Sequence, residues 1–142
     1  MISFETLISL IALVVAIASF LYTWHFNRYS ITVDSRYKDV IEGQLYYSFV
    51  VNNTSGRSLT INNVELFNKD DHLITDNGFV FAKDGDLERN PAFNSDPFTE
   101  SFVLMPYSDI EFSYYLDEKP SKIKVTTDYK INRFHQSQTF NA

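Results

Sequence analysis

The chain has 142 residues, a formal net charge of −6 at neutral pH and no cysteine. The absence of cysteine excludes disulfides, thiolate nucleophiles and sulfur-based zinc sites. The acidic balance disfavours nucleic acid as a partner, because binding to phosphates requires clustered Lys and Arg.

The first predicted element is an apolar stretch near the N-terminus. Between Thr6 and Trp24 no side chain is charged. As an α-helix, this stretch matches the thickness of the hydrocarbon layer of a bilayer. Tyr22, Trp24 and Arg28 follow at its end, as is typical of residues that anchor a helix at the membrane interface. Residues 1–28 are therefore predicted to form one transmembrane anchor that contacts the lipid bilayer of the cell membrane.

Two other interpretations of this stretch stay open. Ala16-Ile17-Ala18 fits the small-x-small pattern of signal-peptide cleavage, but the preceding residues MISFET hold no Lys or Arg, which the start of a signal peptide needs. The other interpretation is a buried core helix, for which a domain of this size offers little volume. The pattern favours an anchor that is retained.

Charges that flank the stretch predict its orientation. Arg28, Arg36 and Lys38 lie on its C-terminal side, whereas its N-terminal side has neither Lys nor Arg. Because Lys and Arg are enriched on cytoplasmic flanks, the remainder of the chain is predicted to lie in the cytoplasm.

Small residues recur within the stretch at helical spacing. Ala12 and Ala16 form a small-xxx-small pair, which lets two helices approach closely in lipid. We expect a stripe for helix packing, including packing against a second copy of the chain; the alternative is that Ala and Ser are simply common in membrane helices. The stripe consists of Ser9, Ala12, Ala16 and Ser19.

Residues 29–142 read as short strands and turns. They predict one all-β domain, an Ig-like β-sandwich, with a small closed barrel as the alternative. Residues 45–52 are apolar in both alternating phases, which predicts a central strand covered on both faces. The alternation in residues 59–66 slips at Asn62-Asn63, which predicts a β-bulge. The remaining predicted strands are SITVDSRY, HLIT, FVFA, TESFVLM, IEFSYYL and SKIKVTTDYKI.

Residues 83–98 form a long connection without hydrophobic periodicity, and this connection carries Phe93 and Phe98. Long irregular loops are frequently binding loops, so the two rings are candidates for a partner surface. The alternative is that they close one end of the sandwich.

Charged residues are segregated along the chain. Between residues 70 and 118 there are twelve acidic residues and two basic ones, whereas from residue 119 onward five basic residues face one acidic residue. Lys122 and Lys124 alternate with apolar residues on a half-exposed strand and are further candidates for a partner surface. Such asymmetry either attracts a partner, a second copy included, or only keeps the protein soluble.

No motif for chemistry is complete. The chain has no phosphate-binding glycine loop, serine elbow or nucleotide fingerprint. The carboxylates in residues 84–88 begin like a calcium loop, but Arg89 and Ser95 occupy the positions that require Gly and Glu. The sequence therefore predicts no catalytic residue, no metal and no cofactor, and a role other than enzyme.

The layout resembles that of many uncharacterised single-pass bacterial or prophage-encoded membrane proteins. The resemblance rests on YYSFVVNNTSGRSLTINNVELF, where a strand ending at Asn53 and a short turn precede the strand Leu59 to Leu66. It implies one N-terminal transmembrane helix and one Ig-like domain, and it implies no activity.

Together these features predict a single-pass, membrane-anchored, non-enzymatic protein-interaction module displayed at the cytoplasmic face. Its expected partner is another membrane or cytoplasmic protein, with homo-oligomerisation included. The alternative is a membrane effector of a phage-defence or toxin-like system, whose β domain senses a ligand and whose helices oligomerise in the membrane.

Overall fold

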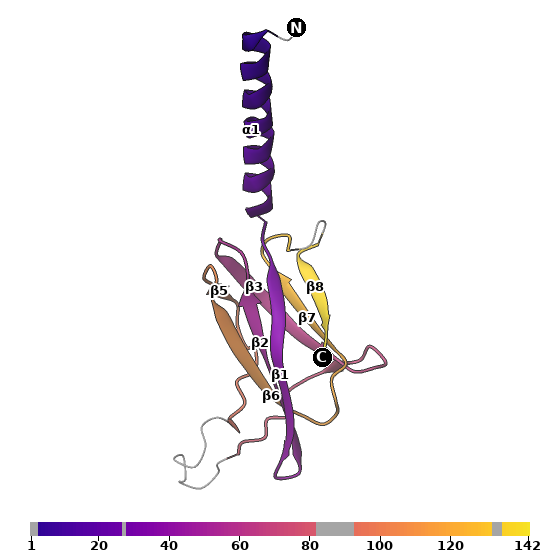
Figure 1. The fold of residues 1–142 in the computed structure, drawn as a ribbon. Helices are drawn as coiled ribbons and strands as arrows, with labels where there is room; N and C mark the ends of the chain where they lie inside the picture. The colour runs from indigo at the N-terminus through magenta and orange to yellow at the C-terminus, as the bar shows by residue number, and fades with distance from the viewer. Residues whose placement is uncertain (1–2, 27, 82–92, 132–134) are drawn as a thin grey trace.

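The computed structural model describes residues 3–26, 28–81, 93–131 and 135–142, and it shows one helix standing on a two-layered β domain (Figure 1). The helix is α1 (Phe4–Phe26). The strands are β1 (Ile31–Ile41), β2 (Gln44–Asn53), β3 (Leu59–Phe67), β4 (Leu73–Ile74), β5 (Phe102–Leu104), β6 (Asp109–Leu116), β7 (Lys122–Thr127) and β8 (Ser137–Asn141).

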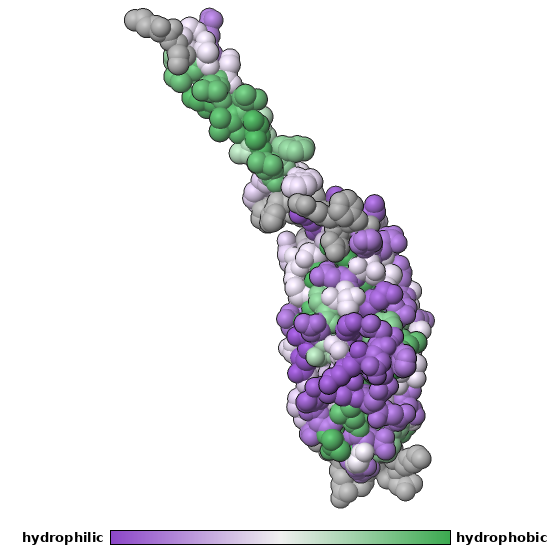
Figure 2. Space-filling view, turned by 90° about the vertical axis from the view of Figure 1, so that its right-hand side faces the viewer, coloured by the Kyte–Doolittle hydropathy of each residue, from purple (hydrophilic) through white to green (hydrophobic). Residues whose placement is uncertain are grey.

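Helix α1 begins at a capped first turn. The Ser3 hydroxyl accepts a hydrogen bond from the Thr6 backbone N–H at 3.2 Å, and Glu5 lies in the first turn, where the helix dipole favours a negative charge. The span Phe4–Trp24 is long and apolar enough to cross a membrane, and none of it is buried against the sandwich. α1 is therefore not a core helix of this domain, and its apolar surface contrasts with the largely polar domain in Figure 2.

The β domain consists of two sheets. The first has the strand order β1-β2-β6, and the second has the order β4-β3-β7-β8, with β5 also paired to β3. Every pairing is antiparallel. No ladder joins the two sheets among the strands that the structure describes, so the domain is a β-sandwich rather than a closed barrel.

Strand β2 is covered on both faces, as its sequence predicts. Tyr47, Phe49 and Val51 lie in the core between the sheets, whereas Tyr46 and Ser48 are buried on the outer face of the first sheet. The core between the sheets also contains Ile31, Val33, Leu59, Ile61, Val64, Leu66, Ile74, Leu104, Phe112, Tyr114, Leu116, Ile123 and Val125.

Two local predictions are confirmed. The register of β3 against β7 shifts between Ile61 and Asn63, at the site of the predicted bulge. Ile123 and Val125 of β7 are fully buried, whereas Lys122 and Lys124 are only half-buried, which is the predicted alternation. A further register shift, in β1, occurs between Asp34 and Tyr37.

One other local prediction is wrong, and one strand has no predicted counterpart. Phe79–Phe81, the described part of the predicted strand FVFA, is not a strand; the Phe79 ring instead packs edge-on against Tyr115 at 4.8 Å, so it covers β6 rather than pairing with a strand. Strand β8 has no counterpart among the predicted strands, because four of its five residues SQTFN are polar and only Phe140 packs against the core. Its order comes from pairing with β7. Most of the long connection 83–98 and the calcium-like spacing at 84–88 lie outside the described residues.

Candidate functional site

The end of the sandwich next to α1 brings together segments that are far apart in the sequence (Figure 1). Phe26 ends the helix and Ile31 begins β1, so the five Cα–Cα steps between them span at most about 18 Å. This end of the domain therefore stays close to the end of α1 at any angle between them. We call it the helix-proximal end, and it consists of residues 28–30, 54–58, 105–108 and the described part of 128–136.

The predicted interfacial residues lie where α1 ends. The Arg28 guanidinium carbon lies 3.8 Å from the centroid of the Trp24 ring, in cation–π contact. Tyr22 and Trp24 are both more than half exposed on the last turns of α1. The structure thus brings Trp24 and Arg28 together and places Tyr22 on the same part of the helix.

Aromatic stacking fixes the connection between α1 and β1. The Tyr29 and Tyr129 rings stack with centroids 4.3 Å apart and planes 1° apart, and the Arg57 guanidinium carbon lies 5.7 Å from the Tyr29 ring centroid. The Thr54 N–H donates to the Ser30 carbonyl at 3.0 Å. These contacts join the start of β1 to two other connections, and sequence reasoning missed them because the two tyrosines are one hundred positions apart.

Asn53 organises the same end from inside the domain. Its side chain is 1% exposed, and its Nδ2 donates to the carbonyls of Arg57 at 2.7 Å, Leu104 at 3.3 Å and Met105 at 2.9 Å. Its Oδ1 accepts from the backbone N–H of Ser55 at 3.0 Å and from the Ser55 hydroxyl at 2.7 Å. One buried amide therefore holds the β2–β3 turn against the end of β5.

A cleft of about 450 Å³, which we call the junction cleft, opens at the helix-proximal end. Tyr107 is held at its mouth with a positive φ of 54°. A Cβ atom on Gly56 would lie 3.1 Å from the Tyr107 hydroxyl, so glycine leaves room for that ring. The described residues that line the cleft include no acidic side chain; they are Arg28, Tyr29, Ser30, Thr54, Ser55, Gly56, Tyr107 and Ile131.

The small-residue stripe lies on a helix that the sandwich does not cover. The Ser9 hydroxyl donates to the Glu5 carbonyl at 2.9 Å, within the helix. Ala12, Ala16 and Ser19 are exposed along α1. Packing of this stripe against another helix stays a prediction.

Phe93 and Phe98 belong to different layers of the domain. Phe93 packs edge-on against Tyr46 on the outer face of the first sheet, with centroids 5.7 Å apart, and its carbonyl accepts from the Tyr115 hydroxyl at 2.7 Å. Phe98 packs against the core, with its ring centroid 6.0 Å from that of Phe112. Both rings are half-buried, and their use as a partner surface stays a prediction.

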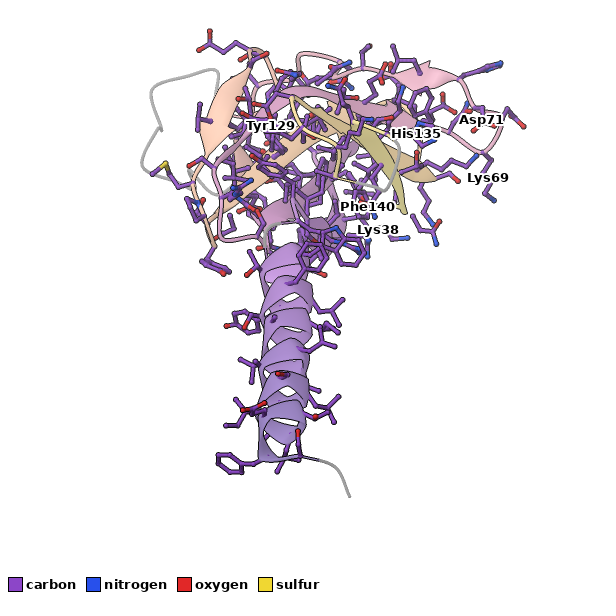
Figure 3. All side chains as sticks on the ribbon, turned by 90° about the horizontal axis from the view of Figure 1, so that it is seen from above. Lys38, Lys69, Asp71, Tyr129, His135 and Phe140 are labelled. Atoms are coloured by element: carbon purple, nitrogen blue, oxygen red, sulfur yellow. The ribbon has the colours of Figure 1, made fainter. Side chains whose placement is uncertain are left out.

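Lys122 and Lys124 face acidic residues of their own domain. Lys122 Nζ lies 2.6 Å from Asp71 Oδ1, and Lys124 Nζ lies 3.0 Å from Glu65 Oε2. Asp71 and Lys69 lie on the turn that projects sideways from the sandwich (Figure 3). The charge segregation of the sequence is therefore partly compensated in the fold, and a role of the two lysines in binding a partner stays a prediction.

Within the described ranges, no group of three or more His, Cys, Asp or Glu side chains could hold a metal ion. Burial raises the pKa of Tyr47 and of Tyr114 to about 12, so both hydroxyls are neutral at physiological pH. These two groups contribute to the core of the domain. Besides the junction cleft, cavities lie on the outer face of the first sheet, about 450 Å³, and beside β3 and β4, about 380 Å³.

Comparison of the chain with protein-family models, curated proteins and solved structures finds no match.

Proposed function

We propose that this chain is a single-pass, membrane-anchored, non-enzymatic protein-interaction module. One observation carries the proposal: the 21-residue span Phe4–Trp24 is entirely exposed beside a sandwich that has its own core. At 1.5 Å per residue the span is about 31 Å long, close to the hydrocarbon thickness of a bilayer. An apolar helix that no part of its domain covers requires another apolar environment, and lipid of the cell membrane provides it.

We further propose that the sandwich is Ig-like. The order β1-β2-β6 opposite β4-β3-β7-β8 supports this, because it corresponds to strands A, B and E facing strands C, F and G of an Ig domain. Antibody domains join strands B and F by a disulfide. Here β2 and β7 contribute Phe49 and Val125 to the same core, and apolar packing takes the place of that bond.

The orientation we propose places the sandwich at the cytoplasmic face. Arg28, Arg36 and Lys38 follow α1 in the sequence, and the fold adds Arg57 and Lys130 at the helix-proximal end. Positive residues next to a membrane span favour the cytoplasmic side.

For the partner surface we favour the outer face of the first sheet. A cavity of about 450 Å³ lies there, with Phe93 in its lining. Tyr37 on β1 and Glu111 on β6 lie at its border and are exposed to solvent. Aromatic side chains beside a cavity are typical of residues that anchor a protein partner.

The test is chemical crosslinking of the full chain in native membranes, followed by its isolation after solubilisation. We expect one membrane or cytoplasmic protein, or a second copy of this chain, to be captured and to be lost with Glu111→Lys. Glu100→Lys makes the same charge change at an exposed position outside this cavity and is expected to leave capture unchanged. If neither another protein nor a second copy of this chain is captured, the proposal is refuted.

A second candidate function is that of a membrane effector in a phage-defence or toxin-like system, in which the β domain senses a ligand. It is favoured by the exposure of the small-residue stripe, which leaves α1 able to oligomerise in lipid. We expect overexpression of such an effector to dissipate the membrane potential, and Ala12→Ile with Ala16→Ile to restore it. A membrane potential that is unaffected by overexpression would eliminate this candidate.

A further inference from the structure

We propose that the junction cleft binds the phosphate of an anionic phospholipid, so that the helix-proximal end of the sandwich rests on the membrane surface. This inference depends on the proposed function, because it requires α1 to be embedded in lipid. It adds a second, headgroup-specific contact to the anchoring by the helix.

The position of the cleft is the first support. Arg28 lies in the cleft lining and also against the Trp24 ring, at the end of the apolar span where a tryptophan is expected to lie at headgroup level. Stacking of Tyr29 on Tyr129 then ties the domain to this point of the chain. The cleft is therefore held beside the headgroups.

The chemistry of the cleft is the second support. Arg28 provides a guanidinium, whose planar donors match a phosphate, and the hydroxyls of Ser30 and Thr54 lie 2.8 Å apart in the same lining. Arg57 adds a second guanidinium next to the Tyr29 ring. A volume of about 450 Å³ accommodates a phosphodiester with its neighbouring headgroup atoms.

Acidic residues at this end do not cancel the charge of Arg28 in the cleft lining or of Arg57 beside the Tyr29 ring. The Asp128 carboxylate accepts hydrogen bonds at 2.8 Å from both the N–H and the hydroxyl of Thr60, so both of its oxygens are bonded to β3. Asp109 begins β6 and is not part of the lining. The local charge therefore favours an anion.

Exposed side chains around the helix-proximal end distinguish a lipid from free phosphate as the ligand. Met105, Tyr107 and Tyr129 are 60%, 71% and 47% exposed at the helix-proximal end. Apolar and amphipathic side chains beside cations fit the boundary between headgroups and acyl chains, whereas free phosphate would leave them in water. Tyr107 keeps its position there in a left-handed backbone conformation, which is rare for an aromatic residue.

The test uses the full chain in vesicles, with tryptophan fluorescence as the readout. In a Trp24→Phe background, Met105→Trp reports on the helix-proximal end. Leu73→Trp is a similarly exposed control on β4, which pairs with the end of β3 that is farther from residues 54–58. The vesicles contain either phosphatidylcholine alone or an equal mixture with phosphatidylglycerol, with lipids brominated near the carbonyl end of their acyl chains. We expect severalfold stronger quenching of Met105→Trp than of Leu73→Trp, and stronger quenching in the mixed vesicles.

Charge variants test the phosphate contact. Arg28→Gln with Arg57→Gln is expected to reduce docking on the mixed vesicles about fivefold for each arginine, as removal of one surface charge next to an anionic leaflet predicts. Arg36→Gln with Lys69→Gln removes the same charge from exposed positions outside the cleft and is expected to have little effect.

The outcomes separate this inference from the proposed function. In the parent protein, quenching of Trp24 reports that α1 is embedded; if Trp24 is quenched but Met105→Trp is not, the anchor stands and the docking is refuted. If Trp24 is not quenched, both the membrane anchor and the docking of the cleft on lipid are refuted. Equal quenching in both lipid compositions, or displacement by inorganic phosphate at constant ionic strength, would also overturn lipid phosphate as the ligand.

Discussion

At the scale of single residues, two buried polar side chains on β2 differ in their partners. Asn53 uses both of its side-chain polar atoms in hydrogen bonds, whereas the Tyr47 hydroxyl is buried without a hydrogen-bond partner in the described part of the chain. Because an unsatisfied buried polar group costs free energy, the two side chains are expected to affect stability in opposite directions.

Asn53→Ala is expected to lower the free energy of unfolding by about 2 to 3 kcal/mol, because three carbonyls and the Ser55 hydroxyl lose their buried partner. Asn52→Ala is the matched control on the other face of β2, where the side chain bonds to Asp34 near solvent, and it is expected to cost less than about 1 kcal/mol. Urea titration of the full chain in detergent micelles, followed by circular dichroism, measures both. Equal effects would contradict the role assigned to Asn53.

Tyr47→Phe is expected to raise the free energy of unfolding by about 1 kcal/mol, because it removes a buried hydroxyl without a partner among the described residues. Tyr114→Phe makes the same change where the hydroxyl accepts from the Phe98 N–H at 3.1 Å, and it is expected to be destabilising by a similar amount. The same titration compares them. A destabilising Tyr47→Phe would show that this hydroxyl has a partner.

The same two tyrosines predict the alkaline limit of stability. Burial raises the pKa of Tyr47 and of Tyr114 from 10.0 to about 12, so the folded state holds these protons more tightly than the unfolded state. Their contribution to the free energy of unfolding is complete below pH 10. It decreases as the pH rises toward 12, by about 1.4 kcal/mol per pH unit for each group. Unfolding free energies measured across this range should fall less steeply in Tyr47→Phe. An identical slope in the variant would contradict the prediction.

At the scale of elements, the hydrophobic periodicity of the sequence predicts those strand features that depend on neighbouring residues alone. Residues 45–52 are apolar in both phases, and β2 is indeed covered by the second sheet on one face and by Phe93 on the other. The slip at Asn62-Asn63 marks a bulge, because a change of phase within one strand requires an extra residue.

Elements whose structure depends on distant partners could not be predicted in this way. Strand β8 has no apolar alternation and is ordered by β7, and the sequence FVFA has strand-like composition but Phe79 packs against Tyr115 instead. For the candidate site, the placement of Tyr22, Trp24 and Arg28 near the end of α1 follows from local sequence, and their role at a membrane interface stays a prediction. The stacking of Tyr29 on Tyr129 could not be predicted, because no local pattern links the two positions.

The small-residue stripe gives α1 a testable property. Ala12→Ile with Ala16→Ile is expected to weaken helix association, because larger side chains prevent the close approach of two backbones in lipid. Val14→Ile adds one methylene group on the opposite face of α1 and controls for the position of the added bulk. Energy transfer between labelled full-length chains in vesicles measures association. An equal loss of energy transfer in both variants, or no loss in either, would show that the stripe is not a packing surface.

At the scale of the whole molecule, the length of the strands sets how far the domain extends from the helix-proximal end. β1 has eleven residues, so the β1–β2 hairpin extends about 36 Å from the helix-proximal end. Its turn is formed by Glu42 and Gly43, both with positive φ, at the end of the domain opposite α1 (Figure 1). In the function that we propose, the end next to the helix faces the membrane, and the outer face of the first sheet remains accessible to the proposed partner.

Labelling of a single cysteine with a membrane-impermeant maleimide tests the central claim most directly, because the parent chain has no cysteine. Asp70→Cys introduces the thiol at an exposed turn of the sandwich. For an anchor that is retained and a sandwich in the cytoplasm, we predict labelling only after the cells are permeabilised, on a full-length chain that sediments with membranes. Labelling in intact cells, or a soluble chain that begins near Ser19, would contradict the account.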